Sequence, residues 1–424
     1  MTALSPHDRR PFRRFLLAAG FTNLGDGIAT LAWTWLATHL TRDPFLIALM
    51  PVALRLPWFL FAIPAGLVTD RVQRKRLLLA MDLIRGLAFG MAAACIWQAL
   101  PLEPPQAEGV SDPLLFTALA LCAAVIGIAE VFRDTAAQTV LPSIVDHDRL
   151  EAANARFWTV ELVGNTLLGP ALGAFLIGLA LPLPFVVNAA AYLVAALILA
   201  RITIPRRGER PARASIRQEL GEGLRFLVNQ PTLRLLAVFT GGFNLLHQMI
   251  VVGLVLHAQE NLHLGAEAFG LVLSAGAFGG IVAGFVASPI IRWLGGARVA
   301  QCASLACGFA FGLLLLVESG LGLSVALMLF SFFGLLWDTV SVSFRQRAVP
   351  DALLGRVNSL YRLCSWGMMP VGLALSGLSV ELASQLVPRE TALLAPFLIA
   401  TIGVFVLTLA GWRGIGRGFP GRTA

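Results

Sequence analysis

The sequence predicts an all-α integral membrane protein, with twelve transmembrane helices arranged as two parallel six-helix repeats. Hydrophobic residues make up 57% of the 424 residues and charged residues only 13%, with a mean hydropathy of +0.78. Soluble domains carry about 25% charge. Apolar runs of spanning length occur repeatedly, since about 20 helical residues cross a bilayer core. The two halves of the chain also share short motifs in the same order.

The predicted spans fall into two sets of six, separated by one long polar segment. That segment, "RITIPRRGERPARASIRQELGEGLRFLVNQPTLR", predicts a linker with an amphipathic surface helix. We therefore expect an N-terminal bundle over residues 1–201, a linker over 202–231, a C-terminal bundle over 232–412 and a tail over 413–424. The spans are expected near 14–40, 45–69, 77–100, 113–133, 155–179, 183–201, 232–258, 267–291, 299–318, 321–344, 357–384 and 391–412.

Basic residues gather in alternate connections between these spans. They lie in residues 9–14, 71–76, 149–156, 201–234 and 413–422, whereas the other connections hold mainly acids. Cytoplasmic loops of membrane proteins carry an excess of Lys and Arg, so both termini are expected in the cytoplasm. The net charge of +8 is spread over short loops rather than one soluble face, which argues against nucleic acid as a partner.

The halves resemble each other at several corresponding places. "GFTNLGDGI" in the first span is similar to "GGFNLLHQMI" in the seventh, and "AGLVTDRVQR" after the second span is similar to "AGFVASPIIR" after the eighth. The similarity is weak, but the matching segments stand in register. It predicts two six-helix halves repeated in the same direction.

The polar loop "GLVTDRVQRKR" at residues 66–76 separates the second and third spans. Its glycine would let the second span approach a neighbour closely, and its aspartate could accept hydrogen bonds from another helix N-terminus. Its bases could pair with acids on adjacent cytoplasmic ends. The loop is either a conformational latch or a solvated loop that only sets topology. The candidate latch residues are Gly66, Asp70, Arg71, Arg74, Lys75, Glu130, Arg133 and Asp134. In the second half Ser288 and Pro289 replace the acid and base, so the latch is expected mainly in the first half.

This loop resembles the Gly-x-x-x-Asp-Arg-x-x-Arg-Lys/Arg signature of the major facilitator superfamily. Longer strings such as "NLGDGIATLAWTWL", "LPSIVDHDRLEAANA" and "VPDALLGRVNSLYRL" resemble its bacterial drug:proton antiporter branch, which includes macrolide efflux proteins and the enterobactin exporter. The resemblance implies the major facilitator fold, transport by alternating access, a place in the bacterial cytoplasmic (inner) membrane, and a monomer that needs no cofactor.

"GNTLLGPALGA" in the fifth span resembles the Gly-Pro-x-x-Gly motif of antiporters, here Gly169, Pro170 and Gly173. Small residues beside a proline predict a kinked helix that packs tightly against a partner, and ordinary helix packing is the alternative. Two departures from the family pattern stand out. Ala174 replaces the last glycine of the motif, and the fourth span lacks a mid-helix arginine, because Arg133 is expected at its cytoplasmic end.

Ionisable residues inside the spans are candidate functional groups, because each costs several kcal/mol unless it is paired or hydrated. Asp26 lies about twelve residues, or about 18 Å, into the first span. Desolvation there favours the protonated carboxyl, so Asp26 is the predicted proton site, with Arg55 or Arg85 modulating it. A structural ion pair with one of these arginines is the alternative. Asp82, three residues before Arg85, is a competing partner for that arginine.

The predicted substrate cavity draws on both halves. A sugar site would need more amides and acids than these spans contain, so a lipophilic or amphiphilic substrate fits better. His247 is either a cavity residue or a hydrogen-bonded interior residue. The cavity candidates are Asn23, Trp33, Glu161, Asn244, His247, Trp337 and Asp338.

Taken together, these features predict a secondary transporter that exports drug-like or siderophore-like amphiphiles in exchange for protons. A lysophospholipid or metabolite carrier without proton coupling is the first alternative. A membrane enzyme or assembly factor is the second, although no nucleophile–base pair or phosphate loop supports an enzyme. No metal site or disulfide is expected, because the cysteines lie in apolar runs without CxxC spacing: Cys95, Cys122, Cys302, Cys307 and Cys364.

Overall fold

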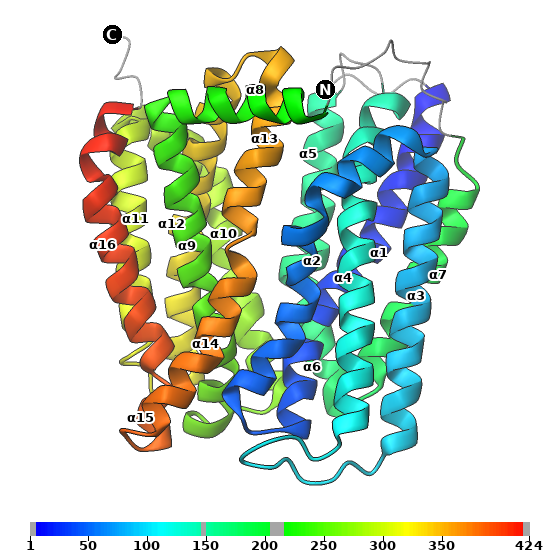
Figure 1. The fold of residues 1–424 in the computed structure, drawn as a ribbon, viewed down its shortest axis with the longest axis vertical. Coiled ribbons are helices and arrows are strands. Elements are labelled where there is room, and N and C mark those ends of the chain that lie inside the picture. The colour runs from blue at the N-terminus through cyan, green and yellow to red at the C-terminus, as the bar shows by residue number, and fades with distance from the viewer. Residues whose placement is uncertain (1–5, 146–149, 204–215, 419–424) are drawn as a thin grey trace. The chain divides into compact units, whose positions relative to one another are not determined.

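The computed structural model describes residues 6–145, 150–203 and 216–418. These residues form helices and connecting turns without a strand, apart from one isolated bridge between Thr41 and Gln106 (Figure 1). The prediction of an all-α fold is therefore confirmed. The chain divides into two compact units: an N-terminal unit of Met1–Glu209 with Ala266–Ser274, and a C-terminal unit of Arg210–Gly265 with Ala275–Ala424.

The helices of each unit follow the chain in order. The N-terminal unit contains α1 (Pro6–Leu40), α2 (Pro44–Arg71), α3 (Arg74–Ala99), α4 (Pro113–Ile144), α5 (Leu150–Glu161), the π-helical η2 (Leu162–Leu168), α6 (Gly169–Leu179), α7 (Leu183–Ala200) and the start of α10. The C-terminal unit contains α8 (Ile216–Asn229), α9 (Pro231–Leu256), the π-helical η3 (His257–Asn261), most of α10 (Ala266–Leu294), α11 (Gly296–Leu313), α12 (Gly320–Ala348), α13 (Asp351–Trp366), α14 (Met369–Ser384), α15 (Arg389–Ala392) and α16 (Ala395–Gly418).

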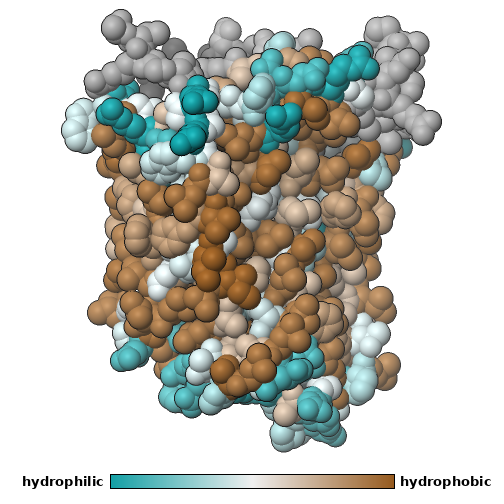
Figure 2. All heavy atoms as spheres, turned by 60° about the vertical axis from the view of Figure 1, so that its left-hand side comes forward, coloured by the Kyte–Doolittle hydropathy of each residue, from teal (hydrophilic) through white to brown (hydrophobic). Residues whose placement is uncertain are grey.

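Eleven helical segments of the described residues are long and apolar enough to cross a membrane, and each coincides with a predicted span. The ninth predicted span corresponds to α11, which is not among the eleven. Its polar residues Arg298 and Gln301 lower the hydropathy of a short, 18-residue helix. Hydrophobic side chains cover the middle of the face in Figure 2, and hydrophilic side chains gather at its two ends, as expected of a membrane protein.

Helix ends follow from local capping chemistry. Pro44 begins α2 behind Asp43, whose carboxylate accepts from the backbone N–H groups of the first turn, and Asp112 caps α4 in the same way. At the other end of the unit, Lys75 donates to the carbonyl of Ala200, at the C-terminus of α7, over 2.7 Å. A cation there offsets the negative end of the helix dipole.

The fifth predicted span is one continuous run of three segments rather than a single regular helix. It begins as α5, passes through the π-helical η2 and continues as α6, where Gly169 and Pro170 stand at the first two positions. Pro170 has no backbone N–H and its ring crowds the preceding turn, and the wider π turn stands directly before it. Gly169 and Gly173 press against the backbone of α1 at Gly27 and Ile28. The small residues thus bring two backbones together.

The eleventh predicted span, residues 357–384, is not a single helix. Residues 367–368 interrupt it between α13 and α14. Pro370 near the start of α14 lacks an N–H group for the preceding turn.

The amphipathic segment of the linker forms α8, which lies across the end of α9 and packs against α9 and α13 (Figure 1). The last helix extends to Gly418, so the first residues of the predicted tail are helical.

We expect Gly27→Ala to destabilise the protein. A Cβ at residue 27 would overlap the carbonyl oxygen of Asn165 and lie 2.8 Å from that of Gly164, and such overpacking costs about 1–3 kcal/mol. The measurement is thermal unfolding of the purified protein in detergent. The matched control is Gly90→Ala in α3, where the new Cβ would meet only the Ala189 Cβ at 3.9 Å. Equal melting temperatures for the two variants would show that the α1–η2 contact can adjust.

Candidate functional site

Charged side chains from four helices meet inside the N-terminal unit. Arg85 on α3 is 1% exposed, and its Nη2 donates to the Oδ1 of Asp26 on α1. The Tyr192 hydroxyl on α7 donates to the same carboxylate oxygen over 2.5 Å. The guanidinium of Arg85 also lies over the Tyr192 ring, 4.3 Å from its centroid. Asp26 is therefore held from two sides, while 22% of its side chain stays exposed.

Glu130 on α4 is the second acid that faces Arg85. Its Oε2 lies 3.5 Å from the Nη2 of Arg85, the same nitrogen that bonds Asp26. Its Oε1 lies 3.3 Å from the Nη1 of Arg55 on α2 and accepts from the Trp58 indole N–H over 3.4 Å. Glu130 therefore joins two arginines, one fully buried and one partly exposed.

A second branch lies one turn away on the same helices. Arg133 on α4 is 4% exposed. It donates to Asp82 on α3 over 3.3 Å, to the Thr22 hydroxyl on α1 over 2.8 Å, and to its neighbour Asp134 over 3.3 Å. The three groups come from two neighbouring helices and from α4 itself, so Arg133 is anchored inside the bundle.

These contacts correct three sequence-based expectations. Arg85 does not pair with Asp82, because its side chain reaches across to α1 and α4 while Asp82 faces Arg133. Arg133 does not stand at the cytoplasmic end of its helix, because α4 continues to Ile144. The third concerns the predicted latch, because Glu130 and Arg133 belong to the buried network, with partners on α1, α2 and α3.

We call this network the charge cluster: Asp26, Asp82, Glu130, Asp134, Arg55, Arg85 and Arg133. It contains one more carboxyl than guanidinium. An uncompensated charge in a low-dielectric interior is costly, so the buried members of the cluster need their partners. The extra carboxyl lies in the Arg133 branch, where Asp134 is 35% exposed, while around Arg85 the carboxyls of Asp26 and Glu130 balance Arg55 and Arg85. Two carboxyls that share an arginine are chemically able to exchange one ionic bond for a bound proton.

Neither the contact of Tyr192 with Asp26 nor the buried position of Glu130 beside Arg85 was predicted from the sequence. One signal was present: Asp82 and Arg85 are three residues apart on α3, and Glu130 and Arg133 are three apart on α4. Residues three apart lie on one helix face, so two such acid–base pairs can face each other across a helix contact. A tyrosine within an apolar span was a further signal, because the chain has only two tyrosines.

The predicted latch is described only in part. The loop lies where it was expected, since α2 ends at Arg71 and Arg74 begins α3. The side chains of Asp70 and Arg71 lie outside the described part of the structure. Around Gly66 no described atom of this unit lies within 4 Å of an added Cβ, so this glycine does not mark a close approach here. Lys75 binds the helix end at Ala200 rather than an acid.

The predicted cavity residues separate into two groups. Trp33 is 0% exposed and packs against Phe89 and Phe185, and Trp337 is 2% exposed and stacks on Phe239 at 4.3 Å. Both indoles therefore belong to helix packing rather than to a cavity wall. Asn23, 8% exposed, donates back to the Ala19 carbonyl of its own helix.

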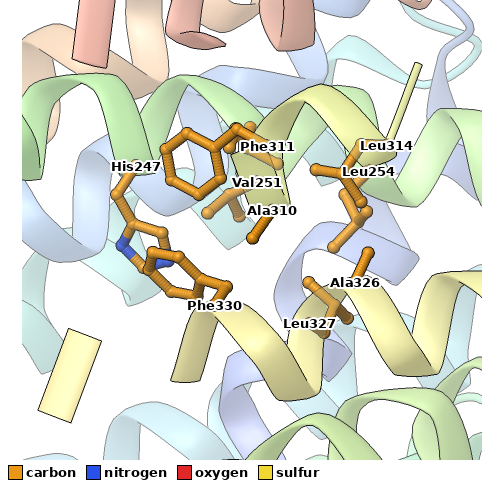
Figure 3. Close-up of a pocket in the computed structure, with 10 residues that line it drawn as sticks. His247, Val251, Leu254, Ala310, Phe311, Leu314, Ala326, Leu327 and Phe330 are labelled. Atoms are coloured by element: carbon orange, nitrogen blue, oxygen red, sulfur yellow. The ribbon is translucent and has the colours of Figure 1, made fainter. Parts of the chain in front are cut away.

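The remaining candidates lie elsewhere in their units. Asn244 on α9 donates to the Ser365 carbonyl over 3.0 Å, which ties α9 to the end of α13. Asp338 on α12 is exposed. Glu161 is the last residue of α5, directly before the π turn. His247 borders a cavity within the C-terminal unit and stacks on Phe330, with ring centroids 4.7 Å apart (Figure 3).

Comparisons with known proteins agree with a transporter. The MFS_3 family, described as transmembrane secretion effectors, matches residues 1–412. The multidrug efflux pump Tap of Mycolicibacterium fortuitum is 23% identical, over 94% of this chain and 96% of its own length. The enterobactin exporter EntS of Citrobacter koseri is 23% identical, over 94% of this chain and 92% of its own length.

Solved structures agree on the fold. A bacterial homologue of the human lysosomal transporter Spinster, in an inward-facing state, gives a TM-score of 0.72 at 14% identity over the full length of both chains. A bacterial homologue of the iron transporter ferroportin gives 0.68 at 16% identity, over 96% of this chain and all of its own. With a family match along nearly the whole chain, the protein belongs to the MFS_3 transmembrane secretion effectors of the major facilitator superfamily, a family of transporters and not of enzymes.

Proposed function

We propose that this transporter exports amphiphilic small molecules in exchange for protons by alternating access, with Asp26 as its proton site. The observation that carries the proposal is the buried guanidinium of Arg85, whose Nη2 faces Asp26 and Glu130 at once. Two carboxyls that compete for one arginine allow a proton to replace one ionic bond without leaving the arginine unpaired.

The proposed proton cycle follows from these contacts. When Asp26 is ionised, Arg85 and the Tyr192 hydroxyl both bind it. When a proton binds Asp26, the ionic bond to Arg85 weakens, and the guanidinium keeps Glu130 as its counter-ion at 3.5 Å. Leaving a buried charge without its partner costs about 3–5 kcal/mol. Glu130 offsets most of that cost, so Asp26 can bind a proton without leaving Arg85 unpaired.

Asp26 also stands beside the contact between α1 and the fifth span. The next residue, Gly27, packs against the backbone of η2 and Gly169. A change in how Arg85 holds α1 therefore acts on the same turn that packs against a helix with π-helical geometry. Such π turns concentrate at functional sites. We propose that this contact passes the protonation state of Asp26 to the movement of the fifth span.

Exchange for one proton supplies enough energy for efflux. A proton that crosses ~100 mV releases about 2.3 kcal/mol, and one pH unit adds about 1.4 kcal/mol. For an uncharged substrate this supports a gradient of roughly a few-hundredfold. For a monovalent cation the electrical contributions cancel, and about tenfold per pH unit remains.

The wider architecture is part of the proposal. We take α11 as a twelfth span, which gives two six-helix halves repeated in the same direction around the linker that contains α8. Both termini then lie in the cytoplasm of a bacterial inner membrane, and the protein works as a monomer. Relatives named as a multidrug efflux pump and an enterobactin exporter support export of amphiphiles.

We expect Asp26→Asn to abolish proton-driven export. The amide keeps the size of the side chain but neither binds nor releases a proton. The measurement is resistance of a pump-deficient bacterial host to macrolides, dyes, biocides and siderophores, at matched expression. Glu103→Gln, on an exposed loop, is the control and should match the wild type. Resistance that survives Asp26→Asn, and survives an uncoupler as well, would instead favour a carrier without proton coupling.

We expect Glu130→Gln to move half-maximal export to lower pH, by about one pH unit, or about 1.4 kcal/mol. Without the negative charge of Glu130 the surroundings of Asp26 are more positive. Asp26 then binds its proton only at a higher proton concentration, that is, at lower pH. The measurement is the pH profile of substrate export from inverted membrane vesicles. Trp58→Phe, which removes the indole hydrogen bond to Glu130 but keeps every charge of the cluster, should leave the profile within a few tenths of a pH unit. A shift to higher pH would contradict the proposed sharing of Arg85.

A further inference from the structure

A cavity within the C-terminal unit is lined almost entirely by hydrocarbon. It lies between α9, α11 and α12 and has a volume of about 40 Å³, more than the roughly 10–15 Å³ that one water needs. Figure 3 shows His247 at one end of the lining, beside Phe330. The lining residues are His247, Ile250, Val251, Leu254, Ala310, Phe311, Leu314, Ala326, Leu327 and Phe330. A cavity of this composition stays dry and accepts apolar groups.

The helices around the cavity have counterparts in the N-terminal unit. "RGLAFG" at residues 85–90 of α3 matches "CGFAFG" at residues 307–312 of α11, and the Asn-Leu pair at residues 23–24 of α1 matches the pair at residues 244–245 of α9. The packing agrees, because α3 contacts α4 and α7 as α11 contacts α12 and α16, and α1 contacts α7 as α9 contacts α16. Equivalent positions in the two units can therefore be compared.

A leucine stands in the cavity wall where the other unit has a tryptophan. Trp33 lies ten residues after Asn23, and Leu254 lies ten residues after Asn244. In the N-terminal unit the indole of Trp33 packs against Phe89 on α3 and Phe185 on α7 and is 0% exposed. Leucine is smaller than tryptophan, and in the C-terminal unit the cavity lies beside Leu254 and Phe311, the counterpart of Phe89.

The same comparison explains why the cavity carries no charge. Asp26 corresponds to His247, and Arg85 corresponds to the buried Cys307. The ion pair of the N-terminal unit is thus replaced by an imidazole and a thiol. The imidazole stacks on Phe330 at 4.7 Å and remains able to form hydrogen bonds at the edge of the cavity.

We propose that this cavity holds a compact apolar group of the transported molecule, either the edge of an aromatic ring or a branched alkyl group, while His247 bonds a polar atom next to that group. This inference rests on the proposed export function and narrows its substrates to molecules with an uncharged apolar arm beside a hydroxyl, carbonyl or amine. The N-terminal unit then exchanges protons, and the equivalent place in the C-terminal unit recognises the substrate.

Isobutanol is the probe for this cavity, because it joins a compact branched alkyl group to a hydroxyl, as the proposal requires. The measurement is the binding of isobutanol to the purified, full-length protein in lipid nanodiscs by saturation-transfer NMR. We expect Leu254→Trp to weaken binding at least tenfold, because the new side chain fills the cavity. Ala326→Leu fills it from α12 and should have the same effect if Leu254→Trp does not fold. Val238→Trp on the same helix, at a 65% exposed position, is the matched control and should bind like the wild type.

Two further comparisons sharpen the test. His247→Phe should keep isobutanol binding within a few-fold but abolish the preference for isobutanol over its methyl ether, which has no O–H to donate. Asp26→Asn should bind isobutanol normally, so a failure of proton-coupled export leaves this inference standing. Equal binding to the wild type, Leu254→Trp and Ala326→Leu would overturn it, even if Asp26-dependent export were demonstrated.

Discussion

The buried guanidinium of Arg85 is the interaction on which the N-terminal unit depends. At 1% exposure it has lost its water, so protein groups must compensate its charge. α1 supplies Asp26, α4 supplies Glu130 and α7 supplies the Tyr192 ring, and each of these helices is thereby fixed against α3. In the proposed cycle, a protonation event at this point acts on several helices together, which an isolated surface ion pair cannot do.

The two units use equivalent positions for different chemistry. In one, charged side chains and a fully buried indole fill the space between the helices. In the other, a thiol, an imidazole and a leucine stand at the matching positions, and an apolar cavity lies beside the imidazole and the leucine. In the proposed function, the first place exchanges protons and the second receives an apolar group of the substrate.

Features that depend on neighbouring residues could be predicted, and features that depend on distant residues could not. Hydropathy is a local property, so the predicted spans coincide with all eleven candidate spans. The ion pair between Arg85 and Asp26 joins positions 59 residues apart, and no local pattern predicts that Arg85 pairs with Asp26 rather than with Asp82. The π turn after Glu161 also escaped prediction, because it reflects tertiary packing around Pro170 and Gly27 rather than propensity.

The most direct measurement of the central claim is proton release on substrate binding. Purified protein in weakly buffered detergent solution, near the pH of half-maximal export, is mixed with a substrate identified by the resistance panel, and the released protons are counted with a pH indicator. The account predicts that substrate binding releases up to about one proton per wild-type molecule and essentially none from Asp26→Asn. The same release from both proteins would show that the proton resides elsewhere and would contradict the account.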